Sequence, residues 1–404
     1  MHWKVLLAIF TATTVLMSAS YTMLIPFLPM YLIEELGVAS EDVNVWSGMI
    51  FSSTFLISAI MAPIWGAIAD KGSHKMMALR ASICLTVAYM VGAIVTTPME
   101  LFWMRCFQGF SAGLWPACLA LMTATLPKDK LGIGLGMMQG GSTAGSVLGP
   151  LMGGLLAEYL GMRASFWVSA AALGMITLLI LLFIKEPKHE KTPEEAVKKP
   201  SNSWDLIRRP VIARMLFAAG VMAMSVMLIQ PILPLYIAQV QGSMDKIVLI
   251  SGIVFSIVGI AGVFGAPLWG RWGGTIGYRP ILYSALLGTG IFGMIQALPG
   301  TLEPFVALRF IGGFFFAGVF PCINALFAEN TSHDERGKVF GLSYSAQQIG
   351  SIAGPILGGY IATWASNAAV ILAHGALVIL LLIFLFLMRP KNASNGTGKI
   401  LNLK

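Results

Sequence analysis

Charged residues are scarce in this chain. They make up 11% of its 404 residues, whereas an ordinary soluble domain carries about 25%. Hydrophobic residues make up 57%. Because so little charge cannot cover a water-exposed surface, the composition excludes most soluble folds.

Cysteines and nucleotide-binding motifs are also sparse. The four cysteines lie in apolar runs without CxxC spacing, which excludes a disulfide framework and gives no zinc site. There is no G-x-x-x-x-G-K-[ST] loop, which argues against an ATP-driven pump. No basic segment is interleaved with aromatic residues, so the net charge of +8 does not indicate a nucleic-acid partner. We expect no metal and no cofactor.

Long apolar runs are what the chain does contain. A run of about 20 residues can cross a bilayer as a helix. Twelve such runs are found, at 5–32, 45–69, 76–97, 99–125, 132–158, 163–184, 210–238, 246–271, 279–299, 302–328, 337–363 and 367–388. The sequence therefore predicts an all-α integral membrane protein with twelve transmembrane helices.

The basic residues predict the orientation of these helices. Of the 26 Lys and Arg residues, only Arg163 and Lys246 fall in expected outer loops, while Arg105 and Arg309 lie inside apolar runs. The others lie at the termini or in loops on the same side. Since Lys and Arg near helix ends are retained in the cytoplasm, we expect a multi-pass cell-membrane protein with both termini cytoplasmic.

The two halves of the chain repeat each other. "GSVLGPLMGG" at 145–154 matches "GSIAGPILGG" at 350–359, and "SGMIFS" at 47–52 matches "SGIVFS" at 251–256. The prolines of "IPFLPMY" also recur in "QPILPLY". Helices 1–6 and 7–12 are thus predicted to be two copies of one bundle.

The repeat sets the expected domain boundaries. We predict an N-terminal six-helix bundle at 1–184, a cytoplasmic linker at 185–209, a C-terminal bundle at 210–388 and a cytoplasmic tail at 389–404. The linker region is rich in charge and proline and is too short for a signalling domain. Parallel repeats of this kind occur in transporters that bind substrate between two rocking halves.

The repeated glycine-proline phrase predicts bent, closely packed helices. Proline kinks a helix, and small residues four apart let helices approach closely in lipid. In helix 5 the phrase consists of Gly145, Gly149, Pro150, Gly153 and Gly154. Its recurrence in helix 11 has two interpretations, a second hinge and seal or simply common ancestry of the halves.

Three motifs carry a family resemblance over essentially the whole chain. The helix 5 phrase resembles the antiporter signature of the major facilitator superfamily. "GAIADKGSHK" at 66–75 is similar to its loop 2–3 motif, and "RCFQGFSAG" at 105–113 to its helix 4 motif. The chain looks most like the twelve-helix drug:proton antiporters, the MdtG-like multidrug exporters among them. This resemblance implies the major facilitator fold and transport in the direction of export.

The loop 2–3 motif implies a conformational lock. By resemblance, the lock residues are Gly66, Asp70, Lys71 and Lys75, although the two positions before Lys75 depart from the usual Gly and Arg. A carboxylate at Asp70 can face the positive N-terminal end of the helix at 337–363. The alternative is that Asp70 is a solvated loop acid.

Proton coupling has less support in the sequence. Arg105 inside helix 4 is costly in lipid and, by resemblance, assists proton transfer together with Gln108. The alternative is that it snorkels toward Glu100. No apolar run has a carboxylate at its middle, so Glu158 is the best outer acid. His374, the only intramembrane histidine, is expected to be structural because helix 12 is expected to be peripheral.

The superfamily arrangement would place helices 1, 4, 7 and 10 around a cavity. Their candidate substrate-binding residues are Tyr21, Gln108, Trp115, Met222, Gln230, Phe314, Phe320 and Asn324. Methionine and aromatic side chains suit a surface that accepts many shapes. For a single methionine, core packing is the competing interpretation.

The sequence therefore favours a secondary active transporter that exports lipophilic small molecules by proton antiport with alternating access. The alternative is a dedicated exporter of one endogenous metabolite, such as a siderophore or peptide. A membrane enzyme is disfavoured because clustered catalytic groups are missing from the sequence. The expected partners are the substrate, protons and the lipid bilayer, and the protein is expected to be a monomer.

Overall fold

In the computed structural model, all the regular secondary structure of the described residues is helical. The structure describes residues 3–184, 203–332 and 335–388, except for the side chains of Asp70, Lys71, Lys128, Ser203 and Trp204. Most of the expected linker 185–209 and the whole expected tail 389–404 fall outside these ranges.

Eight α-helices precede the linker region. They are α1 (Trp3–Met23), α2 (Leu28–Glu34), α3 (Val43–Lys71), α4 (His74–Ile94), α5 (Pro98–Phe110), α6 (Leu114–Thr125), α7 (Leu131–Leu160) and α8 (Met162–Phe183). Short 3-10 turns lie at Ile25–Phe27 and Lys128–Lys130.

A short helix, α9 (Ser203–Ile207), begins the next described part of the chain. The eight helices that follow it repeat the order of the first eight. They are α10 (Pro210–Ile229), α11 (Leu233–Gln241), α12 (Ile247–Ile276), α13 (Tyr278–Ile295), α14 (Leu302–Phe316), α15 (Val319–Glu329), α16 (Arg336–Trp364) and α17 (Asn367–Leu387).

Many of these helices can span a membrane. Within the described residues, eight segments are long and apolar enough: Trp3–Glu34, Val43–Ala69, His74–Ile94, Met162–Phe183, Pro210–Ile229, Ile247–Ile276, Leu302–Glu329 and Asn367–Leu387. The expected run 99–125 is divided between α5 and α6, and 279–299 corresponds to the short α13. The runs 132–158 and 337–363 form the long, glycine-rich α7 and α16.

Prolines interrupt the first and seventh predicted helices at equivalent places. Pro26 lies in the turn between α1 and α2, and Pro231 lies between α10 and α11. A proline has no N–H to donate within a helix, so the helix breaks there. Pro29 and Pro234 then lie in the first turns of α2 and α11. The repeat seen in the sequence is therefore a repeat of backbone shape.

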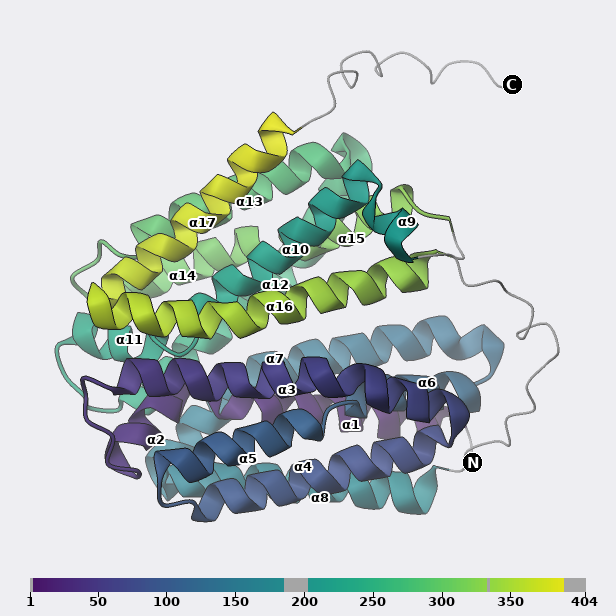
Figure 1. Ribbon diagram of the computed structural model, residues 1–404, viewed down its shortest axis with the longest axis horizontal. Coiled ribbons are helices and arrows are strands. Elements are labelled where there is room, and N and C mark those ends of the chain that lie inside the picture. The colour runs from purple at the N-terminus through teal and green to yellow at the C-terminus, as the bar shows by residue number, and fades with distance from the viewer. Residues whose placement is uncertain (1–2, 185–202, 333–334, 389–404) are drawn as a thin grey trace.

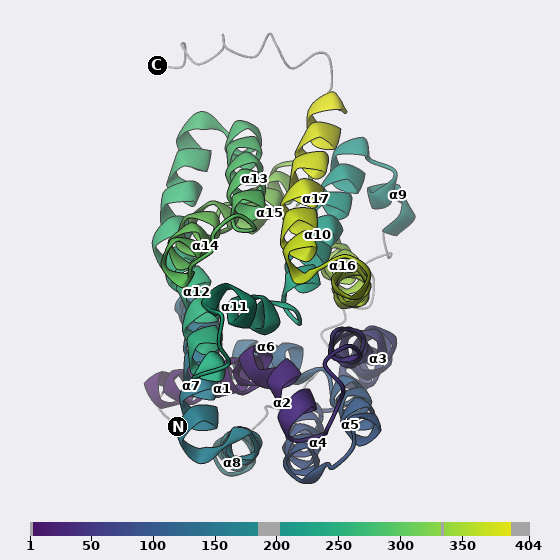
Figure 2. The ribbon, with the colours of Figure 1, turned by 90° about the vertical axis from the view of Figure 1, so that its left-hand side faces the viewer.

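The helices form two layers, with α1–α8 below and α9–α17 above in Figure 1. The first layer is tied together by α1 against α7 and α4 against α8, and the second by α10 against α16 and α13 against α17. The layers meet where α3 contacts α16 and where α7 contacts α12, as the turned view in Figure 2 shows. Buried apolar side chains form one large cluster mainly in the first layer and another within the second.

The glycine-proline phrase holds α7 against α1, as expected from its spacing. Gly145, Gly149 and Gly153 are buried, and a Cβ on any of them would collide with α1. In the second layer, Gly350, Gly354 and Gly358 face α10 in the same way. Only residues without a side chain allow these backbones to approach so closely.

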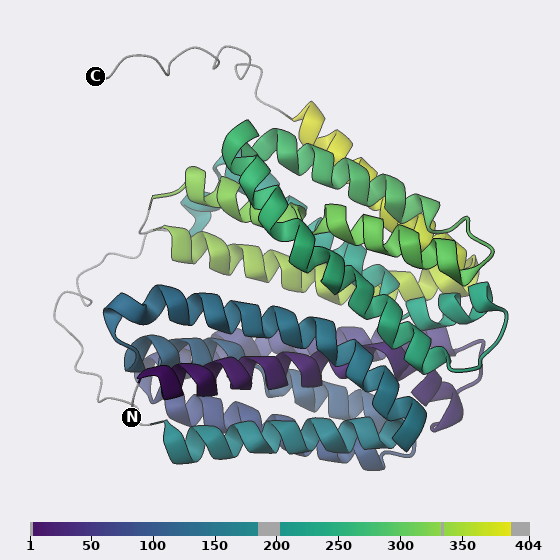
Figure 3. The same cartoon turned by 180° about the vertical axis from the view of Figure 1, so that it is seen from behind.

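One end of the molecule is closed between the layers and the other is open. At the closed end, a Cβ on Gly154 would lie 3.0 Å from the Val248 carbonyl oxygen, and one on Gly359 would lie 2.6 Å from the Asn44 carbonyl oxygen. Toward the other end of the same long helices, a Cβ on Gly136 or on any of Gly66, Gly274 and Gly341 would meet nothing within 4 Å. The start of α1 and the end of α17 lie on this open side, where the layers diverge (Figure 3).

Candidate substrate cavity

A cavity of about 370 Å³ lies between the two layers. The first layer contributes Thr22, Ile25, Ser146 and Pro150. The rest of the wall comes from the second layer: Val226, Ile229, Gln230, Leu233, Phe255, Val258, Gly259, Thr289, Gln296, Arg309, Gly312, Gly313, Phe316 and His374. Most of this lining is apolar with a few polar groups, which is the usual composition of a small-molecule site.

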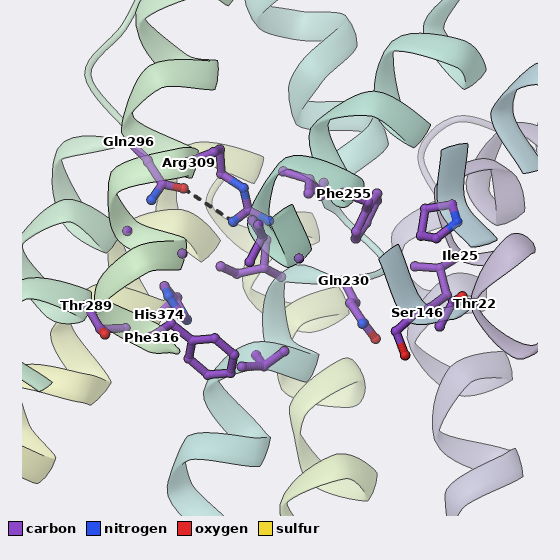
Figure 4. Close-up of a pocket in the computed structure, with 18 residues that line it drawn as sticks. Thr22, Ile25, Ser146, Gln230, Phe255, Thr289, Gln296, Arg309, Phe316 and His374 are labelled. Carbon is purple, nitrogen blue, oxygen red and sulfur yellow. Dashed lines mark hydrogen bonds between the residues drawn. The ribbon is translucent and has the colours of Figure 1, made fainter. Parts of the chain in front are cut away.

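Arg309 and Gln296 form the polar end of this wall (Figure 4). The Arg309 Nη1 donates to Gln296 Oε1 at 3.3 Å, whereas the Arg309 Nε is buried without a hydrogen-bond partner. Gln230 lies on the opposite side, near Ser146 and Thr22. The lining residues just named include no Asp or Glu, so Arg309 has no carboxylate beside it within this wall.

His374 also belongs to this wall, although the sequence predicts a structural role in a peripheral helix. Its side chain is 8% exposed and projects from α17 toward α10. The Nδ1 atom lies 2.7 Å from the Ser225 hydroxyl and 2.9 Å from the Ser225 carbonyl oxygen. The structure thus places the imidazole at the cavity that Arg309 lines.

A second cavity, of about 540 Å³, lies toward the open end among α3, α4, α6 and Tyr344 of α16. Trp65 and Arg80 form its polar wall. The Arg80 guanidinium stacks 3.6 Å from the Trp65 ring centroid and donates to the Ala112 carbonyl at 2.6 Å. Trp65 Nε1 donates to the Phe110 carbonyl at 2.8 Å. These two side chains satisfy carbonyls that the break between α5 and α6 leaves without helical partners.

Arg105 is buried, and its hydrogen-bond partners do not include Glu100, toward which one interpretation of the sequence had it snorkel. Its Nη1 donates to Gln108 Oε1 at 2.9 Å, Gln108 Nε2 donates to the Tyr89 hydroxyl at 3.0 Å, and that hydroxyl donates to the Ser20 carbonyl at 3.1 Å. Glu100 instead closes a capping box at the start of α5. Arg105 therefore joins a polar chain across three helices and does not pair with Glu100.

Two of the predicted substrate-binding residues line these cavities. Gln230 lines the first and Trp115 the second. Tyr21 is 40% exposed and lines neither of the two cavities. Gln108 is buried in the polar chain described above.

The other predicted binding residues lie elsewhere. Met222 is fully buried in the core of the second layer, which corrects its assignment to a cavity. Phe314 packs against Trp269, and Phe320 packs edge-on against Phe316, which is the ring that lines the first cavity. Asn324 is exposed and lies outside both cavities.

The predicted lock residues cluster at the open end. Gly66 faces open space beside the second cavity, and Lys75 donates to the Leu181 carbonyl at 3.0 Å. Asp70 and Lys71 end α3, and their side chains lie outside the described part of the structure. The proton-coupling candidate Glu158 is exposed near the closed end of α7, away from both cavities.

Sequence reasoning missed several lining residues of the first cavity. They are Thr22, Ser146, Phe255, Thr289, Gln296 and Phe316. A usable signal existed for Gln296, because a single amide near the end of an otherwise apolar run usually has a partner. Arg309 was noted in the sequence only as a basic residue inside an apolar run.

Comparison with known proteins identifies the family to which this chain is similar. The family model described as Major Facilitator Superfamily matches residues 10–265 and 215–401. The chain is 31% identical to the multidrug resistance protein MdtG of Proteus mirabilis over 95% of both chains. It is also 31% identical to that of Klebsiella pneumoniae over 96% of this chain and 95% of the relative.

Solved structures share the fold at lower sequence identity. A bacterial homolog of the human lysosomal transporter Spinster, inward-facing and occupied, is 14% identical with a TM-score of 0.82 over 95% of this chain and 96% of that one. The nucleoside transporter NupG is 15% identical with a TM-score of 0.77, over 96% of this chain and 99% of that one. These structures share the fold, while the family model and the matched relatives show that the chain belongs to the Major Facilitator Superfamily and, within it, to the family of the MdtG multidrug resistance proteins.

Proposed function

We propose that this protein is a secondary active transporter that exports lipophilic small molecules by proton antiport. The observation that carries this proposal is the mostly apolar cavity between two helical layers that touch at one end and are open at the other. Such a cavity can face each side of the membrane in turn when the layers rock. The names of the relatives support multidrug compounds as the substrate class.

The proposal includes a topology. The eight apolar spans, together with the four further runs predicted from sequence, give twelve crossings in two six-helix bundles joined by the linker. The basic residues favour cytoplasmic termini, so the open end would face the cytoplasm. The state described here would then be the one that takes up cargo from inside the cell. One chain supplies the whole cavity wall, which fits a monomer.

Transport into proteoliposomes tests this function. Purified protein would be reconstituted, a pH gradient imposed, and the movement of ethidium and anilinonaphthalene sulfonate followed by fluorescence. Gradient-dependent movement of both dyes is expected. Failure of both to move, with monodisperse protein, would contradict multidrug export and favour a dedicated exporter.

A matched pair of variants links this transport to the cavity. Ser146→Trp would fill the space at the cavity wall, so we expect it to block movement of the dyes. Leu148→Trp on the same helix is the control, because Leu148 is exposed and outside the lining. Equal transport by the two variants would place the substrate path elsewhere.

A further inference from the structure

We propose that His374 is the residue that binds the coupling proton. This inference rests on the proposed proton-driven export and names the carrier that the sequence leaves open. It is carried by the position of the imidazole in the wall of the first cavity, where the described lining includes no carboxylate.

The ionisable groups of that lining reduce to two. They are Arg309 and His374. A guanidinium stays protonated at every physiological pH. Histidine is the side chain whose unperturbed protonation changes between pH 5 and 8. Of the two, only His374 can bind and release a proton during a transport cycle.

The contacts of the imidazole identify the atom that would accept the proton. A carbonyl oxygen only accepts hydrogen bonds, so the 2.9 Å contact with the Ser225 carbonyl requires a proton on Nδ1. The neutral ring is then basic at Nε2, for which no hydrogen bond is found among the described residues. Gly293 makes room on this side, since a Cβ there would lie 3.3 Å from Nε2. A proton taken from cavity water adds to Nε2 and gives an imidazolium, and its return to water restores the neutral ring.

The surroundings explain how this proton could bias the transporter. The helices α10, α11, α13 and α16 pack against α17, and Arg309 of α14 is the charged side chain that lines the first cavity together with His374. Arg214 and Tyr283 bond instead to carbonyls at the far end of α17, those of Met388 and Leu385.

Protonation would therefore place two positive charges on one mostly apolar wall. Like charges repel strongly where the effective dielectric is low. The protonated form is consequently favoured in a conformation that admits water to this wall or separates α14 from α17. A proton bound from one side and lost to the other would thus shift the balance between the two conformations.

The competing carrier is Glu158, and a pair of substitutions separates the two. His374→Gln keeps a polar side chain that cannot bind a proton, and Glu158→Gln makes the same change at an exposed carboxylate outside the cavity. Each variant would be reconstituted and assayed twice with ethidium, for transport driven by a pH gradient and for exchange across vesicles without a gradient.

For His374→Gln we expect gradient-driven transport to fall to the rate of protein-free vesicles while gradient-free exchange continues. Glu158→Gln should retain both activities. Gradient-driven transport by His374→Gln at the wild-type rate, or its loss in Glu158→Gln alone, would overturn the inference. If the wild type itself shows no response to the gradient, the proposed proton antiport fails instead.

A milder variant tests the role of His374 while keeping the imidazole, in case His374→Gln does not fold. Ser225→Ala removes the hydroxyl 2.7 Å from Nδ1 and leaves the carbonyl contact in place. Because the hydroxyl oxygen can stabilise the imidazolium, its loss should move the pH of half-maximal exchange downward. Thr289→Val, on the same cavity wall, is its control and should leave that pH unchanged, because the Thr289 hydroxyl donates to the Ala285 carbonyl and not to the imidazole. An identical profile in wild type and Ser225→Ala would contradict the role of His374.

Discussion

The contact between α16 and α3 at the closed end can be tested with a single methyl group. A Cβ on Gly359 would lie 2.6 Å from the Asn44 carbonyl oxygen and 3.3 Å from its carbonyl carbon. Since a Cβ essentially never approaches a neighbour closer than 3.0 Å, Gly359→Ala requires a local separation of at least about 0.4 Å. Both contacting atoms belong to backbone, so a side-chain rotation cannot relieve the overlap.

The free-energy cost follows from this overlap. Overpacking of a well-packed contact costs about 1–3 kcal/mol, which changes an equilibrium about 5–150-fold. The clash exists only while the closed end is shut, so the variant should shift molecules toward a conformation in which that end is open.

Spin labels near the open end would measure this shift. Gly136 in α7 and Gly274 in α12 suit labelling in a cysteine-free background, because a Cβ at either position would meet nothing within 4 Å. Opening of the closed end should bring these sites together, so Gly359→Ala should enrich the shorter distances. Gly341→Ala is the matched control, because Gly341 lies on the same helix as Gly359 but a Cβ there would meet nothing within 4 Å. Identical distance distributions in wild type and Gly359→Ala would refute the reasoning.

Three further substitutions probe other contacts. Tyr89→Phe removes the hydroxyl that donates to the Ser20 carbonyl and should cost about 1–3 kcal/mol, because a buried acceptor loses its donor; thermal unfolding in detergent measures this. Hydrogen bonding to Arg209 lowers the pKa of Glu335 to about 2, below the ordinary glutamate pKa of 4.5. A carboxyl with a lowered pKa stabilises the fold fully above pH 4.5 and loses this as the pH falls toward 2. The difference in thermal stability between wild type and Glu335→Gln should therefore narrow in that window. Asp70→Asn should weaken dye transport in a folded protein, and normal transport by a well-expressed variant would contradict the lock.

Sequence patterns predicted the helices and their close contacts because those depend on local chemistry. Glycines four apart predicted that the helix at 132–158 packs closely against a neighbour, which is the contact of α7 with α1. The repeated prolines marked the two halves as copies, but the breaks at Pro26 and Pro231 were not predicted, because 5–32 and 210–238 read as continuous runs. The break between α5 and α6 was not predicted. It depends on Gly113 at a φ of 112°, a conformation that glycine adopts readily, and one glycine in a glycine-rich chain gives little warning.

The cavity was harder to predict because both faces of a membrane helix can be apolar. Met222 and Gln230 occupy the same predicted helix, yet the first is buried in the core and the second lines the cavity. Hydrophobic periodicity distinguishes residues that face water from residues that face the core, but it does not distinguish core residues from residues that line an apolar cavity. The position of His374 in the cavity wall was not predicted for a related reason, since its helix was expected to be peripheral and the depth of its side chain depends on α10 and α13.

Neighbouring glycines in α7 and α16 face different partners. Gly153 lies against α1 of its own layer while Gly154 faces α12 of the other, and Gly358 and Gly359 divide their contacts with α10 and α3 in the same way. Each of these helices therefore has one side that must stay joined for the layer to assemble and an adjacent side that must part in every cycle. Substitutions at two consecutive codons can thus have different effects, one impairing assembly of the protein and the other impairing the transport cycle. Measuring protein abundance in the membrane together with the transport rate per molecule would distinguish the two.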